Sequence, residues 1–205
     1  LELLVVVAIL VMVVSIALPL FLINKPSDRI DITEKRMDAV KKAIVGDQQA
    51  LDQKARTSFG FVGDLGVLPV DLTELVTNSQ TRPDYQLSNN VWFGWRGPYV
   101  TTDTAQNSTL AGGVVYTVLY DAWGNQFAYT TAPNQFPPDA PTGTVAMLRS
   151  AGPGGTFDPI DAIADDLISY IAEDETRTYV SGNFRDRAGN PVEEGEVTIY
   201  FPNGT

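Results

Sequence analysis

The side chains that could do chemistry in this chain are carboxylates, lysines, tyrosines and hydroxyls, because its 205 residues include no His and no Cys. The absence of His and Cys excludes most zinc, copper, haem and iron–sulfur sites. It also removes every catalytic pair of a nucleophile with a histidine. Paired carboxylates could still hydrolyse a glycosidic bond, but no such pair stands in a supporting context. We therefore expect a protein that is not an enzyme.

The charge of the chain is strongly acidic, with 25 Asp and Glu against 14 Lys and Arg and a formal net charge of -11. Binding to nucleic acid depends on basic patches that neutralise phosphates. We therefore expect no direct nucleic-acid partner. Because no disulfide can form, the fold must be held by its core or by assembly with other subunits.

One carboxylate, Glu2, stands directly before an apolar run from Leu3 to Ile23 that only Ser15 interrupts. A helix of about 21 residues rises roughly 31 Å, enough to cross the hydrocarbon core of a bilayer. A signal peptide would need a basic start and a small-residue cleavage site, which this stretch lacks. A plain membrane anchor fits the hydropathy but leaves Glu2 unexplained, because an ionisable group at membrane depth is costly.

Pro19 lies deep in the same run, where it removes a backbone hydrogen bond and bends or opens the helix. The stretch from Leu1 to Leu10 followed by Pro19 resembles the amino terminus of type IV pilins and type II secretion pseudopilins, which a prepilin peptidase processes. In that family the mature chain begins with a methylated Phe three residues before the position of Leu1. The family's glycine midway between the glutamate and the proline falls on Val11.

The resemblance implies a pilin fold of the α+β class. A long apolar helix with a proline kink would continue as an amphipathic helix packed on an antiparallel β-sheet. Glu2, Val11 and Pro19 would act in assembly, with Glu2 neutralising the amino terminus of a neighbouring subunit. Partners would be further copies of the chain in a homopolymeric helical filament, together with an inner-membrane pilus or secretion assembly machinery.

The rest of the chain is expected to form the head of such a subunit. Apolar side chains at Ile30, Met37, Val40 and Ile44 recur near helical spacing and predict an amphipathic helix that ends near Gly46. Further expected elements are a glycine-rich loop at Phe59–Gly66, a short helix at Val70–Val76 with Asp71 near its start, and strands at Val114–Tyr120, Gln126–Thr131 and Thr144–Arg149.

Two aromatic motifs mark the centre of the chain. Trp95, Gly97, Pro98 and Tyr99 form the first motif, and Asp121, Trp123, Gly124 and Asn125 form the second, which also reads as a turn between strands. Both resemble the major pseudopilin of type II secretion, which favours a structural role for them. The alternative is a sugar-binding platform.

The same resemblance implies a calcium loop after Ser150. Its aspartate pair matches Asp165 and Asp166, whereas an earlier family aspartate falls on Gly154. Asp158 or Asp161 could supply the missing ligand, since calcium takes six to eight oxygens. The competing interpretation is that Asp165 or Asp166 caps a helix at Leu167–Ala172.

Beyond residue 172, Glu173–Glu175 predicts a solvated acidic linker, and a turn at Ala188–Pro191 predicts a β-hairpin that resembles the first strands of carboxypeptidase-regulatory-like modules. The expected organisation is therefore an assembly helix at 1–24, an amphipathic helix at 25–56, a β head at 57–172 and a hairpin appendage at 173–205.

From the sequence we predict a filament subunit, either a major pilin or a secretion-type major pseudopilin. It would sit in the inner membrane before assembly and in an extracellular pilus or periplasmic pseudopilus afterwards. The alternative is a membrane-anchored surface binding or adhesion protein that does not polymerise.

Overall fold

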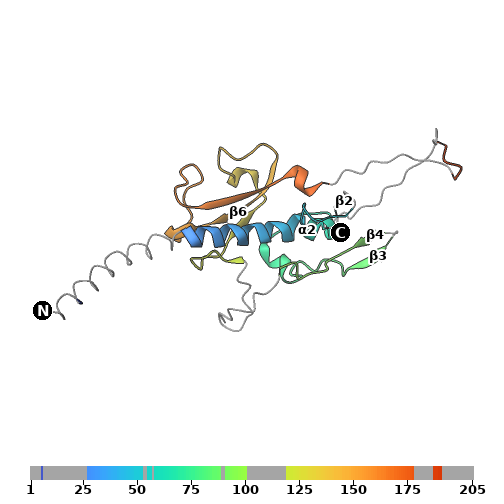
Figure 1. Cartoon of the computed structure of the whole chain (residues 1–205), viewed down its shortest axis with the longest axis horizontal. Helices are drawn as coiled ribbons and strands as arrows, with labels where there is room; N and C mark the ends of the chain where they lie inside the picture. The colour runs from blue at the N-terminus through green and yellow to red at the C-terminus, as the bar shows by residue number, and fades with distance from the viewer. Residues whose placement is uncertain are drawn as a thin grey trace.

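A helix over residues 27–45, called here the long helix, runs along the molecule, and an antiparallel sheet packs against it (Figure 1). The computed structural model describes residues 6, 27–52, 55–56, 58–88, 91–100, 119–177 and 187–190. Glu2, Val11 and Pro19, and with them the predicted assembly helix, lie outside the described residues. No helix within the described ranges is apolar and long enough to cross a membrane.

The long helix buries one face, formed by Thr33, Met37, Val40 and Ile44. Their spacing of three or four residues places them on one side of an α-helix. Ile30 was predicted on this face but is 37% exposed, and Thr33 is buried instead. The Thr33 hydroxyl is satisfied there, because it donates to the Arg29 carbonyl and accepts from the Ala122 N–H. The predicted end near Gly46 is confirmed. The segment predicted as an amphipathic helix over 25–56 is therefore helical only to residue 45, and residues 51–52 and 55–56 form short strands instead.

The sheet against the long helix has the order β5-β6-β7, and both strand pairs are antiparallel. Its strands are β5 (Ala128–Thr130), β6 (Thr144–Ser150) and β7 (Leu167–Ala172). Successive side chains of a strand point to opposite faces. Ala146 and Leu148 of β6 and Ile171 of β7 therefore pack into the core beside the long helix, whereas Met147 and Arg149 face outward. The chain is thus of the α+β class with antiparallel sheets.

The prediction of a helix at Leu167–Ala172 was wrong, because these residues form β7. Strand β7 pairs with β6 from Ser150↔Leu167 to Thr144↔Ala172. The Ile and Tyr side chains suit a strand, and pairing with β6 supplies the backbone hydrogen bonds. Neither Asp165 nor Asp166 therefore caps a helix.

The prediction of a loop at Phe59–Gly66 was also wrong, because helix α2 spans Gly60–Leu65. Phe61 and Leu65 lie one turn apart and are both buried. A Cβ at Gly60 would approach the Ala43 carbonyl oxygen to 2.6 Å, so the glycine lets α2 pack close to the end of the long helix. The glycine at position 60, which indicated a loop, therefore allows α2 to pack closely against the end of the long helix.

Short elements complete the described part of the head. The 3-10 helix η1 (Leu72–Leu75) confirms the short helix predicted there, and Asp71 caps it by accepting from the Thr73 N–H. Two hairpins pair β1 (Leu51–Asp52) with β2 (Ala55–Arg56) and β3 (Gln86–Ser88) with β4 (Val91–Phe93). Further 3-10 turns are η3 (Pro133–Gln135), η4 (Gly152–Gly154) and η5 (Glu173–Thr176).

The acidic run after β7 folds into η5 rather than an irregular linker. Glu173 and Asp174 are exposed, as predicted for a solvated run, whereas Glu175 is partly buried. The Glu175 carboxylate accepts from the Ala172 N–H at 2.8 Å and pairs with Lys41 at 2.8 Å. Lys41 also donates to the Tyr170 carbonyl. These contacts fasten the end of β7 to the long helix. A turn is found at residues 187–189, and the strands predicted on either side of it lie outside the described residues.

Candidate functional site

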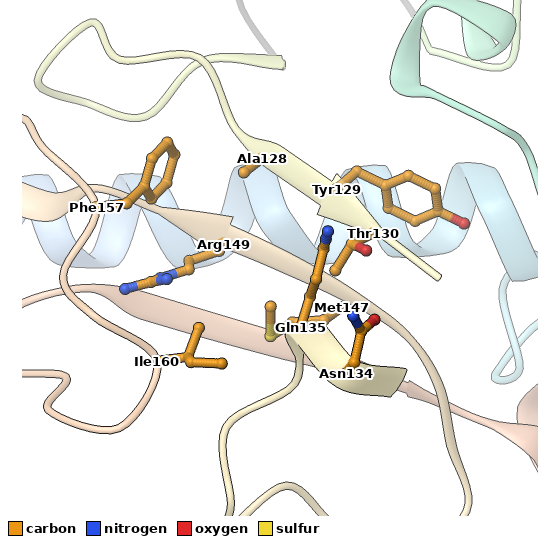
Figure 2. Close-up of a pocket in the computed structure, with 9 residues that line it drawn as sticks. All are labelled: Ala128, Tyr129, Thr130, Asn134, Gln135, Met147, Arg149, Phe157 and Ile160. Carbon is orange, nitrogen blue, oxygen red and sulfur yellow. The ribbon is translucent and has the colours of Figure 1, made fainter. Parts of the chain in front are cut away.

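A shallow pocket of about 300 Å³ opens on the outer face of the three-stranded sheet, which separates it from the long helix (Figure 2). Met147 of β6 forms part of its floor, and Phe157 and Ile160 stand on the loop between β6 and β7. Gln135 of η3 lines another side. We call this cavity the sheet pocket. Most of its surface is apolar, so it suits an apolar group better than a charged one.

Arg149 joins the sheet pocket to the acidic loop beside it. Its side chain is buried and its guanidinium lies 5.4 Å from the centre of the Phe157 ring. The guanidinium donates to the Asp158 carbonyl and forms an ion pair with the Asp166 carboxylate. A buried charge needs such a partner, since leaving it unpaired in the interior is costly. Arg149 therefore fixes the position of Asp166 at the start of β7.

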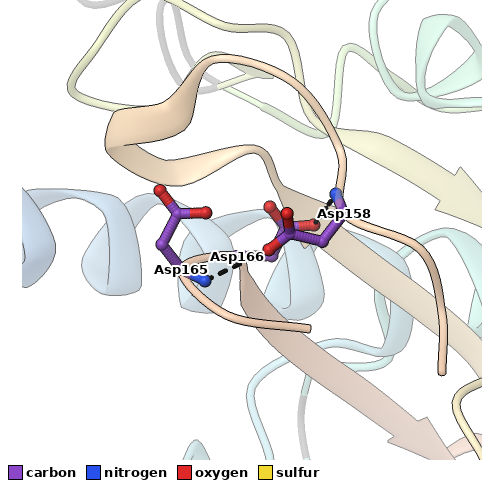
Figure 3. Close-up of side chains that lie close together, drawn as sticks. All are labelled: Asp158, Asp165 and Asp166. Atoms are coloured by element: carbon purple, nitrogen blue, oxygen red, sulfur yellow. Dashed lines mark hydrogen bonds between the residues drawn. The ribbon is translucent and has the colours of Figure 1, made fainter. Parts of the chain in front are cut away.

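Three of the four predicted calcium ligands converge in this loop (Figure 3). Asp158, Asp165 and Asp166 each offer a carboxylate oxygen, and these oxygens lie within 4.8 Å of one another. Asp161 lies outside this group. We call the three residues the acidic cluster. The loop brings them together because β7 begins directly after Asp166, while η4 folds the preceding segment back toward Asp165.

Hydrogen bonds within the loop set the charge of the acidic cluster. The N–H groups of Ala164 and Asp165 donate to the Asp158 carboxylate at 2.8 and 3.2 Å and hold its pKa below the ordinary value. Burial raises the pKa of Asp166, and the Arg149 guanidinium opposes that rise. Asp158 is therefore more strongly ionised than Asp166.

The residues present fit a hard cation. Oδ1 of Asp166 is buried and has no hydrogen-bond partner among the described residues. A Cβ at Gly154 would lie 2.8 Å from a carboxylate oxygen of Asp165, so Asp165 reaches the position where the resemblance places another aspartate. Calcium prefers several carboxylates together with carbonyl oxygens, and a surface loop can offer both. Arg149 already neutralises one of the three charges, which reduces the attraction for a cation.

Asp121, in the second aromatic motif, is a buried hydrogen-bond hub. One carboxylate oxygen accepts from the N–H groups of Trp123 and Asn125, and the other from the Asn125 amide and the Ser150 hydroxyl. Gly124 takes a positive φ of 94°, which the tight turn requires. These contacts tie the turn to the end of β6.

The long helix holds this turn from the other side. Arg36 donates to the carbonyls of Tyr120 and Asp121 at 3.0 and 2.8 Å. The turn therefore joins helix and sheet, as its polar residues satisfy one another and the nearby backbone. The Asn125 amide also donates to the Gly152 carbonyl at 3.2 Å, which links the turn to the calcium loop predicted from the sequence.

The first aromatic motif packs on η1. Trp95 donates its indole N–H to the Glu74 carbonyl at 2.8 Å, and the Tyr99 N–H donates to the Leu75 carbonyl at 2.7 Å. The Trp95 and Tyr99 rings meet edge to face with centroids 6.2 Å apart. Gly97 lies against both rings, and the Gly97–Pro98 peptide is cis. The geometry around these residues is that of internal packing.

Sequence reasoning missed Arg149 and Glu74. The Glu74 carboxylate is fully buried, pairs with Arg82 at 2.9 Å and accepts from the Val70 N–H at 2.6 Å. Arg149 pairs with a residue seventeen positions along the chain. A basic residue inside a predicted strand is the one signal that could have indicated a buried ion pair at Arg149.

No family model, curated protein or solved structure matches this chain. Inference about its function therefore rests on its own residues and their geometry.

Proposed function

We propose that this chain is a structural subunit that polymerises through its amino-terminal helix into a type IV pilus-like filament. The observation that carries the proposal is the position of the long helix. It follows directly on the apolar run from Leu3 to Ile23, and its own apolar face is covered by the antiparallel sheet. A pilin fold would use this arrangement, with a sheet-covered helix in the head and a bare apolar helix for assembly.

In the proposed mechanism, the newly made protein sits in the inner membrane through the apolar run. An inner-membrane machinery then extracts the helix, which packs against the helices of neighbouring copies. Repeated head-to-tail contacts that do not close produce a helical filament rather than a ring. Glu2 would neutralise the amino terminus of the adjacent subunit, and the chain between Val11 and Pro19 would extend during assembly. The described head has no catalytic part in this mechanism.

Electron microscopy of material sheared from cells that express the full chain, with identification by mass spectrometry, tests the proposal. We expect filaments that contain this chain. Long extracellular filaments would assign a surface pilus, and filaments confined to the periplasm of overproducing cells would assign a secretion pseudopilus. Absence of filaments from cells whose membranes contain the protein would contradict the proposal.

A second candidate function is a membrane-anchored binding protein that does not polymerise. The observation in its favour is an exposed, stacked pair of rings, Tyr85 and Trp92. Exposed aromatic side chains mark binding surfaces. This candidate predicts a monomer in detergent under all conditions of assembly, so the same imaging experiment separates the two functions.

We also propose that the acidic cluster holds calcium, with Asp158, Asp165 and Asp166 as ligands. The ion would neutralise converging carboxylates and tie the loop to the start of β7. A ligand at a hundredfold excess over its dissociation constant stabilises the folded state by about 2.7 kcal/mol. For a chain of this size we expect calcium to raise the melting temperature by roughly 5–10 °C.

Thermal unfolding of the full chain in detergent, with calcium or with a chelator, measures this shift. Asp165→Asn should abolish the response to calcium. Asp161→Asn is the matched control, because Asp161 lies on the same loop outside the acidic cluster, and it should keep the response. Equal melting temperatures with millimolar calcium and with chelator would show that the cluster holds no calcium.

A further inference from the structure

The acidic cluster has a positively charged neighbour, Arg149. Its guanidinium pairs with the Asp166 carboxylate and donates to the Asp158 carbonyl. The side chain of Arg149 is 8% exposed and that of Asp166 is 0% exposed, so the attraction between their charges is screened little by water and salt. Two of the three residues proposed to bind calcium are therefore already in contact with a cation.

The hydrogen bonds of the loop leave a limited set of oxygens for a metal ion (Figure 3). Oδ2 of Asp166 pairs with Arg149 and accepts from the Asp158 N–H at 3.3 Å. Oδ1 of Asp166 is buried and has no partner among the described residues. Oδ2 of Asp158 accepts from the N–H groups of Ala164 and Asp165. The open oxygen of a fully buried carboxylate is the feature that points to a bound ion.

The net charge of the site depends on Arg149. The three ionised carboxylates carry one negative charge each, and the guanidinium cancels one of them. A calcium ion would then leave the loop neutral, whereas without Arg149 the loop would still be negative after binding the ion. The number of charged ligands and the rigidity of the site tune calcium affinity over several orders of magnitude.

We propose that Arg149 is a built-in counter-cation that keeps the calcium affinity of the acidic cluster low, with a dissociation constant of about 10⁻⁴ M. The inference rests on the proposed calcium site and names the residue that determines its affinity. Calcium sites of extracellular modules have dissociation constants of about 10⁻⁴–10⁻³ M, whereas those of sensor proteins lie at about 10⁻⁷–10⁻⁵ M. The site would therefore fill where calcium is millimolar and stay empty where calcium is micromolar.

A competing interpretation is that Arg149 orients the loop and that its charge is unimportant. Removal of Arg149 would then release Asp166 and weaken calcium binding. If Arg149 acts through its charge, its removal would strengthen calcium binding. The chain without calcium would nevertheless lose stability, because Asp166 would be buried without a partner. The two interpretations thus predict opposite changes in calcium affinity.

Calcium titration of the full chain in detergent at pH 8, by isothermal titration calorimetry, tests the proposal. Arg149→Gln keeps a donor for the Asp158 carbonyl but removes the charge, and we expect it to bind calcium at least about tenfold more tightly than the natural chain. Arg149→Lys keeps the charge but loses the planar fork of donors, and its dissociation constant should stay within about threefold of the natural value. Unchanged or weaker binding by Arg149→Gln would overturn the proposal.

Thermal unfolding of the same variants gives a second readout. With a chelator, Arg149→Gln should melt at a lower temperature than the natural chain. With calcium at about 10 mM, a hundredfold excess over the proposed dissociation constant, its melting temperature should rise by more than that of the natural chain. If Arg149→Gln does not fold without calcium, Arg149→Lys still decides, because loss of calcium binding in that variant would show that the shape of the guanidinium is required rather than its charge.

The matched control is Arg82→Gln, at a second buried ion pair. Arg82 pairs with Glu74 at 2.9 Å, and the Glu74 side chain is 0% exposed, as is that of Asp166. The control should also lower the melting temperature without calcium, but its calcium dissociation constant should equal that of the natural chain. Tighter calcium binding by Arg82→Gln would attribute the effect of Arg149→Gln to lost stability and so overturn the proposal.

The titrations separate this inference from the proposal that the cluster holds calcium. If the natural chain binds calcium and Arg149→Gln binds it no more tightly, the calcium site stands and the role of Arg149 is overturned. If Arg149→Gln binds calcium and the natural chain does not, the calcium proposal is contradicted for the natural chain, and the guanidinium is supported as a competing cation. Absence of binding by every variant would overturn both.

Discussion

Replacing Glu2 by alanine is expected to abolish filaments while leaving the amount of protein in the membrane unchanged. Glu2 begins the apolar run and, in the proposed assembly, faces the amino terminus of a neighbouring subunit. Removing one partner of a buried ion pair costs about 3–5 kcal/mol, because the remaining charge stays without compensation. Since every subunit repeats this contact, the loss applies to each addition step, and filament yield should fall by more than a hundredfold.

Filament counts by electron microscopy, normalised to membrane-bound protein on immunoblots, measure this effect. Glu2→Gln keeps the shape but not the charge and should also assemble poorly. Pro19→Ala is a comparison variant in the same helix, which should change filament yield or form by hindering extension of the helix. The proposed assembly mechanism would be wrong if Glu2→Ala assembled normally and Pro19→Ala gave unchanged filaments.

Asp121→Ala is expected to lower the free energy of unfolding of the head by about 3–5 kcal/mol. The carboxylate is 1% exposed and accepts four hydrogen bonds, from Trp123, from Ser150 and twice from Asn125. A buried donor that loses its acceptor costs about 1–3 kcal/mol. Domains of ordinary size are stable by only 5–15 kcal/mol, so this single change removes a large part of the total.

Urea unfolding followed by tryptophan fluorescence measures the difference. Asp121→Asn should cost less, because the amide keeps the oxygen that faces the Trp123 and Asn125 N–H groups. Asp139→Ala is the control, since Asp139 is an exposed aspartate of the same head, and it should change stability by less than about 0.5 kcal/mol. An Asp121→Ala variant as stable as the control would contradict the role of Asp121 as a hub.

Elements with a local signal were predicted correctly. The long helix ends where Gly46 indicated, and Asp71 caps the short helix η1 as its position suggested. Strand β6 follows its run of apolar and β-branched residues almost to the residue. For the helix end and the cap, neighbouring residues of the same segment decide the structure, and a sequence displays such information directly. For β6 the sequence displays only the preference for a strand, since β5 and β7 supply its hydrogen bonds.

The errors concern segments whose structure depends on distant partners. Glycines at 60 and 63 indicated a loop, yet packing against the long helix makes α2 a helix. β7 is a strand because β6 supplies its hydrogen bonds along the whole segment. In the candidate site, three of four predicted aspartates converge, whereas the Arg149 ion pair that orders one of them joins residues that no local pattern connects.

The fastening of β7 to the long helix has a mechanical consequence. Among the described strands β7 lies at the edge of its sheet. A pull on the chain beyond residue 177 would separate an unsupported edge strand from β6 one hydrogen bond at a time, starting at Ala172. Lys41 holds the carboxyl-terminal end of β7, because it donates to the Tyr170 carbonyl and pairs with the Glu175 carboxylate. Tension applied to the chain after residue 177 would therefore be transmitted to the long helix. The hydrogen bonds between β6 and β7 would then be loaded together, in shear, rather than broken one after another.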